Sequence, residues 1–185
     1  MHIPDGILSP AVMASTGVLS AGAVTLLWRK IKQQFYQQAI PKIAVMAAFL
    51  FVAQMINVPI AVGASGHLLG GLLAALLLGP AAGMFVLTLV IMVQMLLFQD
   101  GGLAALGANV LNMAIMGVGS GYIFYSGIQM VIERRKWGET ARNINIFLSA
   151  WLAVEVSAIM CGLELAFSGV AGFGPTVGLL AGVHA

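Results

Sequence analysis

Long apolar runs, separated by short polar or glycine-rich breaks, dominate the hydropathy pattern of this chain. Such runs predict helices that cross a membrane, because about 20 apolar residues span the bilayer core. Glycine, proline and charged residues mark the breaks. We expect six full helices and a partial seventh, at about residues 10–28, 40–57, 66–79, 81–98, 108–131, 144–168 and 176–185.

The expected fold is therefore an all-α integral membrane protein with one transmembrane domain over residues 1–185. Ser9 and Pro10 form a good cap and first turn for the first helix, which leaves residues 1–9 as a loop before it. We expect this loop to enter the bundle from the outer side. The segment 176–185 is about half as long as a bilayer requires, so a truncated or processed carboxy terminus is expected.

Composition supports a membrane protein and argues against several other classes. Hydrophobic residues make up 61% of the chain and charged residues only 8%, whereas soluble domains carry about a quarter charged residues. The net charge of +2 is too small to indicate a nucleic-acid-binding protein. A single cysteine, Cys161, cannot form an internal disulfide.

The positions of the basic residues predict the orientation in the membrane. Positively charged residues concentrate in cytoplasmic connections. With the amino terminus outside a cell membrane, every Lys and Arg falls in or just beside the first and third cytoplasmic connections. These eight residues are Arg29, Lys30, Lys32, Lys42, Arg134, Arg135, Lys136 and Arg142.

The first two residues can chelate one metal ion. The Met1 amine and the His2 amide nitrogen close a five-membered ring, and the amide and the His2 Nδ1 atom close a six-membered ring. A planar peptide makes the three nitrogens nearly coplanar, and a square plane suits Ni²⁺ or Cu²⁺. Because the amine and the amide must both lose a proton, we expect about two protons released per ion. The alternative is a frayed, idle terminus.

His67 is the candidate fourth donor. The chain has three histidines, and His67 lies at the outer entrance of the third predicted helix, on the same side as the amino terminus. A histidine in an apolar chain is a functional candidate, although one that caps a helix would look the same. His184 lies in the incomplete last segment, and we expect its replacement to be tolerated.

Polar residues near this level are candidates for supporting the site. Asn109, Asn112, Met113 and Met116 would share one helix face, with Asn109 supporting an imidazole. The alternative is that asparagines join membrane helices and methionines fill gaps. Ser65 and Asp5 are further candidates; Asp5 would orient an imidazole or balance the charge of the metal ion.

Two glutamates lie in the sixth predicted helix, about 180° apart around its axis. Glu155 and Glu164 therefore cannot form one carboxylate pair. We expect Glu155 near the middle of the membrane and protonated or hydrogen-bonded, and Glu164 nearer the outer end.

The chain carries no nucleotide-binding glycine motif, no HExxH sequence and no internal repeat. An outward metal site without an energy source of its own suggests a capture subunit. The alternatives are a channel or secondary carrier, which would need charges along a path through the bundle, and a metal-dependent enzyme, which would need an open coordination position.

Three segments resemble the CbiM/NikM family, the substrate-specific membrane components of nickel and cobalt energy-coupling factor transporters. They are Met-His-Ile-Pro-Asp-Gly at 1–6, Ser-Gly-His-Leu-Leu-Gly-Gly at 65–71 and Gly-Ala-Asn-Val-Leu-Asn-Met at 107–113. The resemblance implies Ni²⁺ or Co²⁺ bound by Met1, His2 and His67. It also implies partners: a transmembrane coupling protein, two cytoplasmic ATPases and often a small membrane accessory protein. Small residues recur along 11–21 and along 71–83, and we expect the surfaces that they form to dock the coupling protein.

Overall fold

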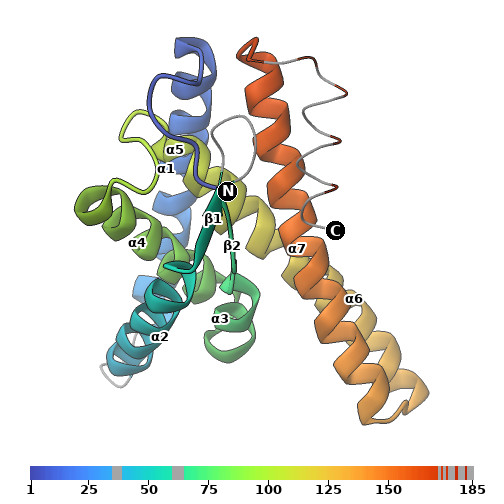
Figure 1. The fold of residues 1–185 in the computed structure, drawn as a ribbon. Coiled ribbons are helices and arrows are strands. Elements are labelled where there is room, and N and C mark those ends of the chain that lie inside the picture. The colour runs from blue at the N-terminus through green and yellow to red at the C-terminus, as the bar shows by residue number, and fades with distance from the viewer. Residues whose placement is uncertain are drawn as a thin grey trace.

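The computed structural model describes residues 1–34, 39–59 and 65–170, together with four later glycines. Of the predicted seventh segment only Gly178 and Gly182 belong to the described residues, so that segment and His184 lie outside them. The elements follow one another along the chain as coloured in Figure 1. They are α1 (Pro10–Gln34), α2 (Ala39–Gln54), β1 (Asn57–Pro59), β2 (Ser65–His67), α3 (Gly71–Leu78), α4 (Pro80–Phe98), α5 (Leu106–Asn109), the π-helical segment η2 (Val110–Gly117), α6 (Val118–Arg135) and α7 (Glu139–Phe167).

Four helical stretches among the described residues are long and apolar enough to cross a membrane. They are Pro10–Lys32, Pro80–Phe98, Leu106–Arg135 and Glu139–Phe167. The 16-residue α2 is shorter, and the eight-residue α3 rises only about 12 Å. The prediction of a helical membrane fold is confirmed. Among the described residues, however, four helices are long enough to cross a membrane, whereas six were predicted.

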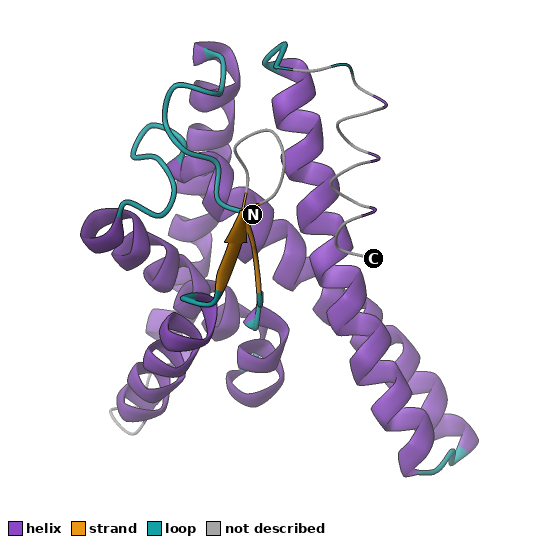
Figure 2. Ribbon diagram, viewed as in Figure 1, coloured by secondary structure: helices purple, strands orange, loops and turns teal. Residues whose placement is uncertain are grey.

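A two-stranded hairpin replaces the predicted end of the second helix and start of the third. β1 and β2 pair antiparallel, with Asn57 opposite His67 and Pro59 opposite Ser65. Figure 2 shows this hairpin beside the amino terminus in an otherwise helical molecule. The prediction of an all-α chain is thus wrong in detail. α3 starts at Gly71, after Gly70 adopts a left-handed φ of 68°, a conformation that glycine adopts without steric cost.

The small residues of α3 and α4 pack inside the bundle. A Cβ at Gly83 would lie 2.5 Å from the Ala75 nitrogen, and Ala75 is only 1% exposed. A Cβ at Gly71 would collide with Val118 and Leu87. These positions permit close helix contact within this chain, so the prediction that the ridge at 71–83 is a free docking surface is wrong.

A π-helical stretch interrupts the predicted fifth helix. η2 lies between α5 and α6, which together form one continuous helical rod. Asn109, Asn112 and Met113 are buried as expected, but Met116 is 38% exposed. Because a π-helix has more residues per turn than an α-helix, it turns Met116 away from the shared face. The predicted stripe therefore ends at Met113.

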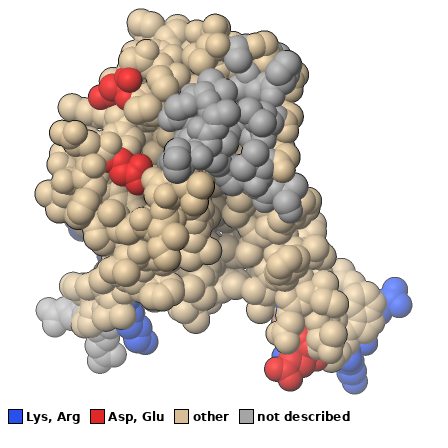
Figure 3. Space-filling model, in the orientation of Figure 1, with Lys and Arg blue, Asp and Glu red and all other residues tan. Residues whose placement is uncertain are grey.

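Charged side chains are unevenly distributed over the molecule. On the face drawn in Figure 3, lysines and arginines stand out at the two lower tips. One tip lies at the start of α2 and the other at the connection between α6 and α7. The amino-terminal loop lies toward the other end of the molecule (Figure 1). This separation matches the charge asymmetry read from the sequence.

Candidate metal site

The amino terminus is buried. Met1, His2 and Ile3 are 1%, 2% and 0% exposed, and Met1 and Ile3 belong to the main hydrophobic core. Figure 1 shows the first residue in the middle of the molecule, beside the strands, before the chain runs out to α1. A frayed terminus is therefore excluded, because the first three residues are packed inside the bundle.

Asn109 holds the main chain directly after His2. The Ile3 N–H donates to Asn109 Oδ1 at 2.8 Å, and Asn109 Nδ2 donates to the Ile3 carbonyl at 3.1 Å. The same carbonyl also accepts the Gly102 N–H at 3.0 Å. Asn109 thus binds the backbone of Ile3 through both of its polar atoms, and its support of an imidazole ring stays a prediction.

Asp5 anchors the loop to the start of α5. Its carboxylate accepts the main-chain N–H groups of Leu103, Ala104 and Ala105, at 2.9, 2.8 and 3.2 Å. These are hydrogen bonds that a carboxylate commonly makes at the amino end of a helix. Asp5 therefore fixes the loop, and the prediction that it orients an imidazole is wrong.

The imidazoles of His2 and His67 stack on one another. Their ring centroids lie 4.7 Å apart and the planes are inclined by 23°. The hairpin brings His67 to this position, because β2 ends at His67 and pairs with Asn57 of β1. The two histidines that the sequence singled out are thus neighbours, although 65 positions separate them in the chain.

The hydrogen bond of His67 identifies its available nitrogen. Nδ1 of His67 lies 2.9 Å from the Leu68 carbonyl oxygen. Because a carbonyl oxygen only accepts, Nδ1 carries the proton and Nε2 carries the lone pair. Nε2 is therefore the atom of His67 that can bind a metal ion.

Burial makes the amino-terminal nitrogens neutral donors. It lowers the pKa of the Met1 amine from 8.0 to about 5, with smaller opposing effects from Cys161 and Asp100. Burial, followed by His67 and the terminal amine, lowers the pKa of His2 to about 2. At neutral pH both groups are unprotonated before any metal ion binds. From these lowered pKa values we expect about one proton, that of the His2 amide, to be released at pH 7, in place of the two expected from a free amine.

Sequence reasoning missed the carboxylate nearest to His2. Asp100 Oδ1 lies 3.3 Å from His2 Nδ1, and Asn57 Nδ2 donates to both Asp100 oxygens at 3.1 and 3.3 Å. Burial is the main cause of a raised pKa of Asp100. In the sequence, Asp100 is a single acidic residue in the polar interval after the fourth apolar run. Nothing there distinguishes it from an ordinary loop residue.

Two of the other candidate supporting residues have different surroundings. Asn112 Nδ2 donates to Glu164 Oε2 at 2.6 Å, so its amide joins η2 to α7. Glu155 and Glu164 are both buried, at 7% and 5% exposed. Ser65 begins β2 opposite Pro59, two residues before His67, and its role in the site stays a prediction.

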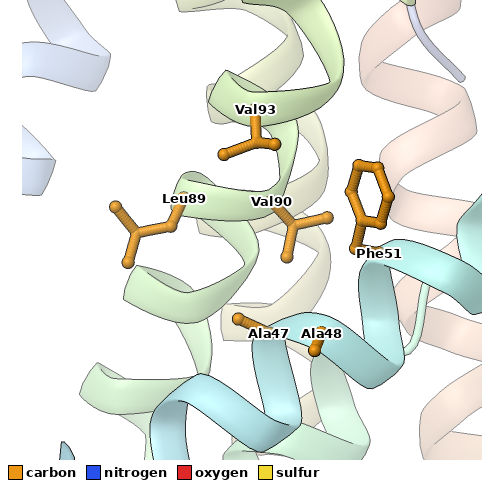
Figure 4. Close-up of a pocket in the computed structure, with 6 residues that line it drawn as sticks. All are labelled: Ala47, Ala48, Phe51, Leu89, Val90 and Val93. Atoms are coloured by element: carbon orange, nitrogen blue, oxygen red, sulfur yellow. The ribbon is translucent and has the colours of Figure 1, made fainter. Parts of the chain in front are cut away.

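The described residues hold no alternative metal site made of side chains alone. Nowhere in them do three His, Cys, Asp or Glu side chains cluster. A cavity of about 200 Å³ between α2 and α4 has only apolar lining side chains and offers no ligand for an ion (Figure 4). The residues that line this cavity are Ala47, Ala48, Phe51, Leu89, Val90 and Val93.

Comparison with known proteins identifies the family of this chain. Residues 2–185 match the family CbiM, described as the cobalt uptake substrate-specific transmembrane region. The chain belongs to the CbiM family. Together with the four apolar helices, this membership makes it a multi-pass membrane protein and a metal-transporter component.

Relatives of this CbiM-family chain carry nickel and cobalt names. It is 36% identical to a putative metal transport protein of Haloquadratum walsbyi, over 100% of the chain and 82% of the relative. It is 38% identical to a putative fused nickel transport protein NikMN of Archaeoglobus fulgidus, over 97% of the chain and 57% of that longer protein. It is 31% identical to the cobalt transport protein CbiM of Acetoanaerobium sticklandii, over 91% and 67%.

Solved structures show the same fold. A crystal structure of a transition metal transporter superposes with a TM-score of 0.88 at 30% identity, and covers 100% of this chain and 84% of the other. A truncated transition metal transporter superposes with a TM-score of 0.83 at 33% identity, over 100% and 89%. The fold is therefore that of transition metal transporters.

Proposed function

We propose that this protein captures Ni²⁺, or Co²⁺, as the substrate-binding subunit of an ATP-driven importer of the energy-coupling factor type. The observation that carries the proposal is the stacking of the half-buried His67 on the buried His2, beside the neutral terminal amine. The ligands are the Met1 amine, the His2 amide nitrogen, His2 Nδ1 and His67 Nε2. The names of the nickel and cobalt relatives support the choice of substrate.

The ring geometry is compatible with shared coordination. With metal–nitrogen bonds of about 2 Å, imidazoles at adjacent corners of a square have centroids roughly 4–5 Å apart. The observed separation of 4.7 Å lies within that range. Binding then requires the two rings to turn their donor nitrogens toward one ion, together with loss of the His2 amide proton. Four nitrogens in a plane favour Ni²⁺, while relatives with cobalt names keep Co²⁺ in the proposal.

The orientation and the partners complete the proposal. The amino-terminal loop faces the outside of the cell membrane, and the basic connections face the cytoplasm, as the charge asymmetry supports. ATP hydrolysis belongs to two separate cytoplasmic ATPases, which a transmembrane coupling protein links to this subunit. A small membrane accessory protein joins some complexes of this kind. The protein itself is not an enzyme in this scheme.

Competition titration of the purified, tag-free protein with Ni²⁺, Co²⁺, Cu²⁺ and Zn²⁺ tests the function. We expect tight one-to-one binding of Ni²⁺ or Co²⁺, and Zn²⁺ should compete poorly for a square-planar site. His67→Ala removes one in-plane nitrogen and should abolish tight binding. His184→Ala is the matched control, and we expect wild-type affinity. Equal losses in both variants, or a preference for Zn²⁺, would contradict the planar site.

A further inference from the structure

A carboxylate lies between the proposed metal site and the surface of the molecule. Asp100 Oδ1 is 3.3 Å from His2 Nδ1, and the Asp100 side chain is 20% exposed whereas that of His2 is 1% exposed. The carboxylate of Asp5, in the amino-terminal loop, is engaged by three main-chain N–H groups. Asp100 therefore connects a buried donor atom of the site with the surface.

The contact between Asp100 and His2 is too long for an ordinary hydrogen bond. N–H···O hydrogen bonds measure about 2.7–3.2 Å. Within the described residues no hydrogen bond reaches His2 Nδ1, which is buried. Two atoms that occupy adjacent corners around one metal ion, with bonds of about 2.1 Å, lie about 3.0 Å apart. At 3.3 Å, the carboxylate oxygen and Nδ1 are close enough to bind one divalent cation together.

The end of α4 places Asp100 beside the His2 ring. The Asp100 N–H donates to the Gln94 carbonyl at 3.3 Å, and the Gln94 side chain donates to that of Gln54, at the end of α2, at 3.0 Å. Gly101 follows with a positive φ of 92°, and an added Cβ there would lie 3.3 Å from His2 Cδ2. A glycine thus lets the loop after α4 lie directly against His2.

Asn57 fixes the orientation of the Asp100 carboxylate. Asn57 Nδ2 donates to both carboxylate oxygens, at 3.1 and 3.3 Å. Hydrogen bonds of this kind stabilise the ionised form of an acid. Asn57 also lies opposite His67 in the hairpin. The strand pair that carries His67 therefore also holds the carboxylate in place.

The charge distribution favours the approach of a cation at this end of the molecule. In the expected orientation the outer connections contain no Lys or Arg. On the face drawn in Figure 3, acidic side chains lie in the upper part and the basic ones at the lower tips. A negative group at a partly buried position without basic neighbours raises the association rate of a cation by roughly 10- to 1,000-fold.

We propose that Asp100 is the entry ligand of the site: its carboxylate and His2 Nδ1 bind the divalent cation first, before the His2 amide loses its proton and the four nitrogens close around the ion. This inference rests on the proposed function. The amide becomes a donor only after losing a proton, whereas a carboxylate is ionised at neutral pH and can hold the ion until then.

Association kinetics of the purified, tag-free protein test this role. Asp100→Asn keeps the shape of the side chain and an oxygen that can accept from Asn57, but it removes the charge. In stopped-flow absorption with Ni²⁺ we expect association to slow by about tenfold or more. The absorption band of the final complex and its dissociation rate should stay close to wild type, because the four nitrogens are unchanged. Asp100→Glu keeps the charge and should recover part of the association rate.

Glu139→Gln is the matched control for the loss of one negative charge. Glu139 is exposed at the start of α7, in the basic connection that follows α6, and we expect the wild-type association rate. Equal association rates in the wild type and Asp100→Asn overturn the proposal. So does a loss of affinity that lies only in faster dissociation with a shifted absorption band, because that result indicates a structural role or a ligand of the final complex.

Mn²⁺ separates the entry ligands from the four nitrogens. It prefers oxygen ligands and has the lowest affinity of its series for nitrogen donors, so we expect it to stop at the entry step. Water-proton relaxation should show weak Mn²⁺ binding to the wild type and to His67→Ala, and none to Asp100→Asn. Tight Ni²⁺ binding should instead be lost in His67→Ala and kept in Asp100→Asn. A wild type that binds no Mn²⁺, or Mn²⁺ binding that survives in Asp100→Asn, overturns the proposal.

The failure of this inference differs from the failure of the proposed function. If the wild type binds no Ni²⁺ while Mn²⁺ binding depends on Asp100, the planar site is wrong and Asp100 is still a cation ligand. If the wild type binds Ni²⁺ tightly and Asp100→Asn associates with it at the same rate, only the entry role of Asp100 is wrong.

Discussion

The side-chain amide of Asn109 pairs with both polar groups of the Ile3 backbone. Oδ1 accepts the Ile3 N–H at 2.8 Å and Nδ2 donates to the Ile3 carbonyl at 3.1 Å, in a fully buried setting. The two residues are 106 positions apart in the chain. This pair holds the peptide that follows His2, so it helps to set where the nitrogens of Met1 and His2 lie.

Replacing Asn109 tests this support. Asn109→Leu leaves the Ile3 N–H buried without its acceptor, which should make the docked position of the loop less stable by about 1–3 kcal/mol. We expect Ni²⁺ binding to weaken about 10- to 100-fold by calorimetry, with the ligand residues unchanged. Asn109→Asp retains the acceptor but loses the donor and should be intermediate. Asn143→Ala, at an exposed position of α7, is the control; a loss there equal to that in Asn109→Leu would refute the assignment.

Lengthening the amino terminus should disrupt binding through both chelation and burial. One alanine inserted between Met1 and His2 adds a second amide nitrogen to the chelate and so displaces His67 from the plane. The longer terminus must also fit into a core where both residues are almost fully buried. An amino-terminal tag, or a retained formyl group, removes the amine as a donor. We expect each change to cost at least about 100-fold in Ni²⁺ affinity, equivalent to roughly 3 kcal/mol. A carboxy-terminal tag serves as control, and wild-type affinity in the amino-terminally tagged protein would place the metal elsewhere.

Proton release on binding should depend on pH in a defined way. Because burial lowers the pKa of the Met1 amine to about 5, the amine is already neutral at pH 7. Calorimetry in buffers of different ionisation enthalpy should give about one proton per Ni²⁺ at pH 7, from the amide, and close to two below pH 5. Two protons at pH 7 would mean that the amine keeps its ordinary pKa and is not buried before binding.

The same shift makes docking of the loop dependent on pH. Above pH 8 the amine is neutral whether the loop is docked or released, so protonation opposes neither state. Between pH 8 and about 5 the released amine binds a proton that the docked amine does not. Docking should therefore weaken by up to about tenfold per pH unit as the pH falls below 8. It should weaken more steeply below about 6.5, where the released His2 also binds a proton that the docked His2, with a pKa lowered to about 2, does not. Hydrogen exchange of the Ile3 amide measures this equilibrium, and protection that stays constant from pH 8 to 5 after correction for intrinsic exchange rates would contradict it.

The contact between α3 and α4 should tolerate no added side chain. A Cβ at Gly83 would lie 2.5 Å from the Ala75 nitrogen, a backbone atom that cannot rotate away. We expect Gly83→Ala to destabilise the protein by about 1–3 kcal/mol, seen as a lower thermal midpoint in detergent. Gly127→Ala, in α6 with nothing within 4 Å of the added atom, is the matched control and should be neutral or stabilising. Equal midpoints for the two variants would mean that the helices can separate at no cost.

The sequence alone determined the features that depend on near neighbours or on summed hydrophobicity. The membrane class and most helix positions follow from the apolar runs, because transfer from water to an apolar phase depends on the local composition of each run. The chelating capacity of Met1 and His2 follows from covalent ring size. Their burial makes this capacity usable, and that required tertiary structure.

Only tertiary structure decided which distant groups meet. An apolar run does not reveal where a helix yields to a strand, so the hairpin that carries His67 and the short α3 were missed. The stacking of His67 on His2 and the pairing of Gln54 with Gln94 join residues that share no periodicity. Such contacts depend on how whole helices pack, since each buried polar group must find its partner wherever the fold brings one within reach.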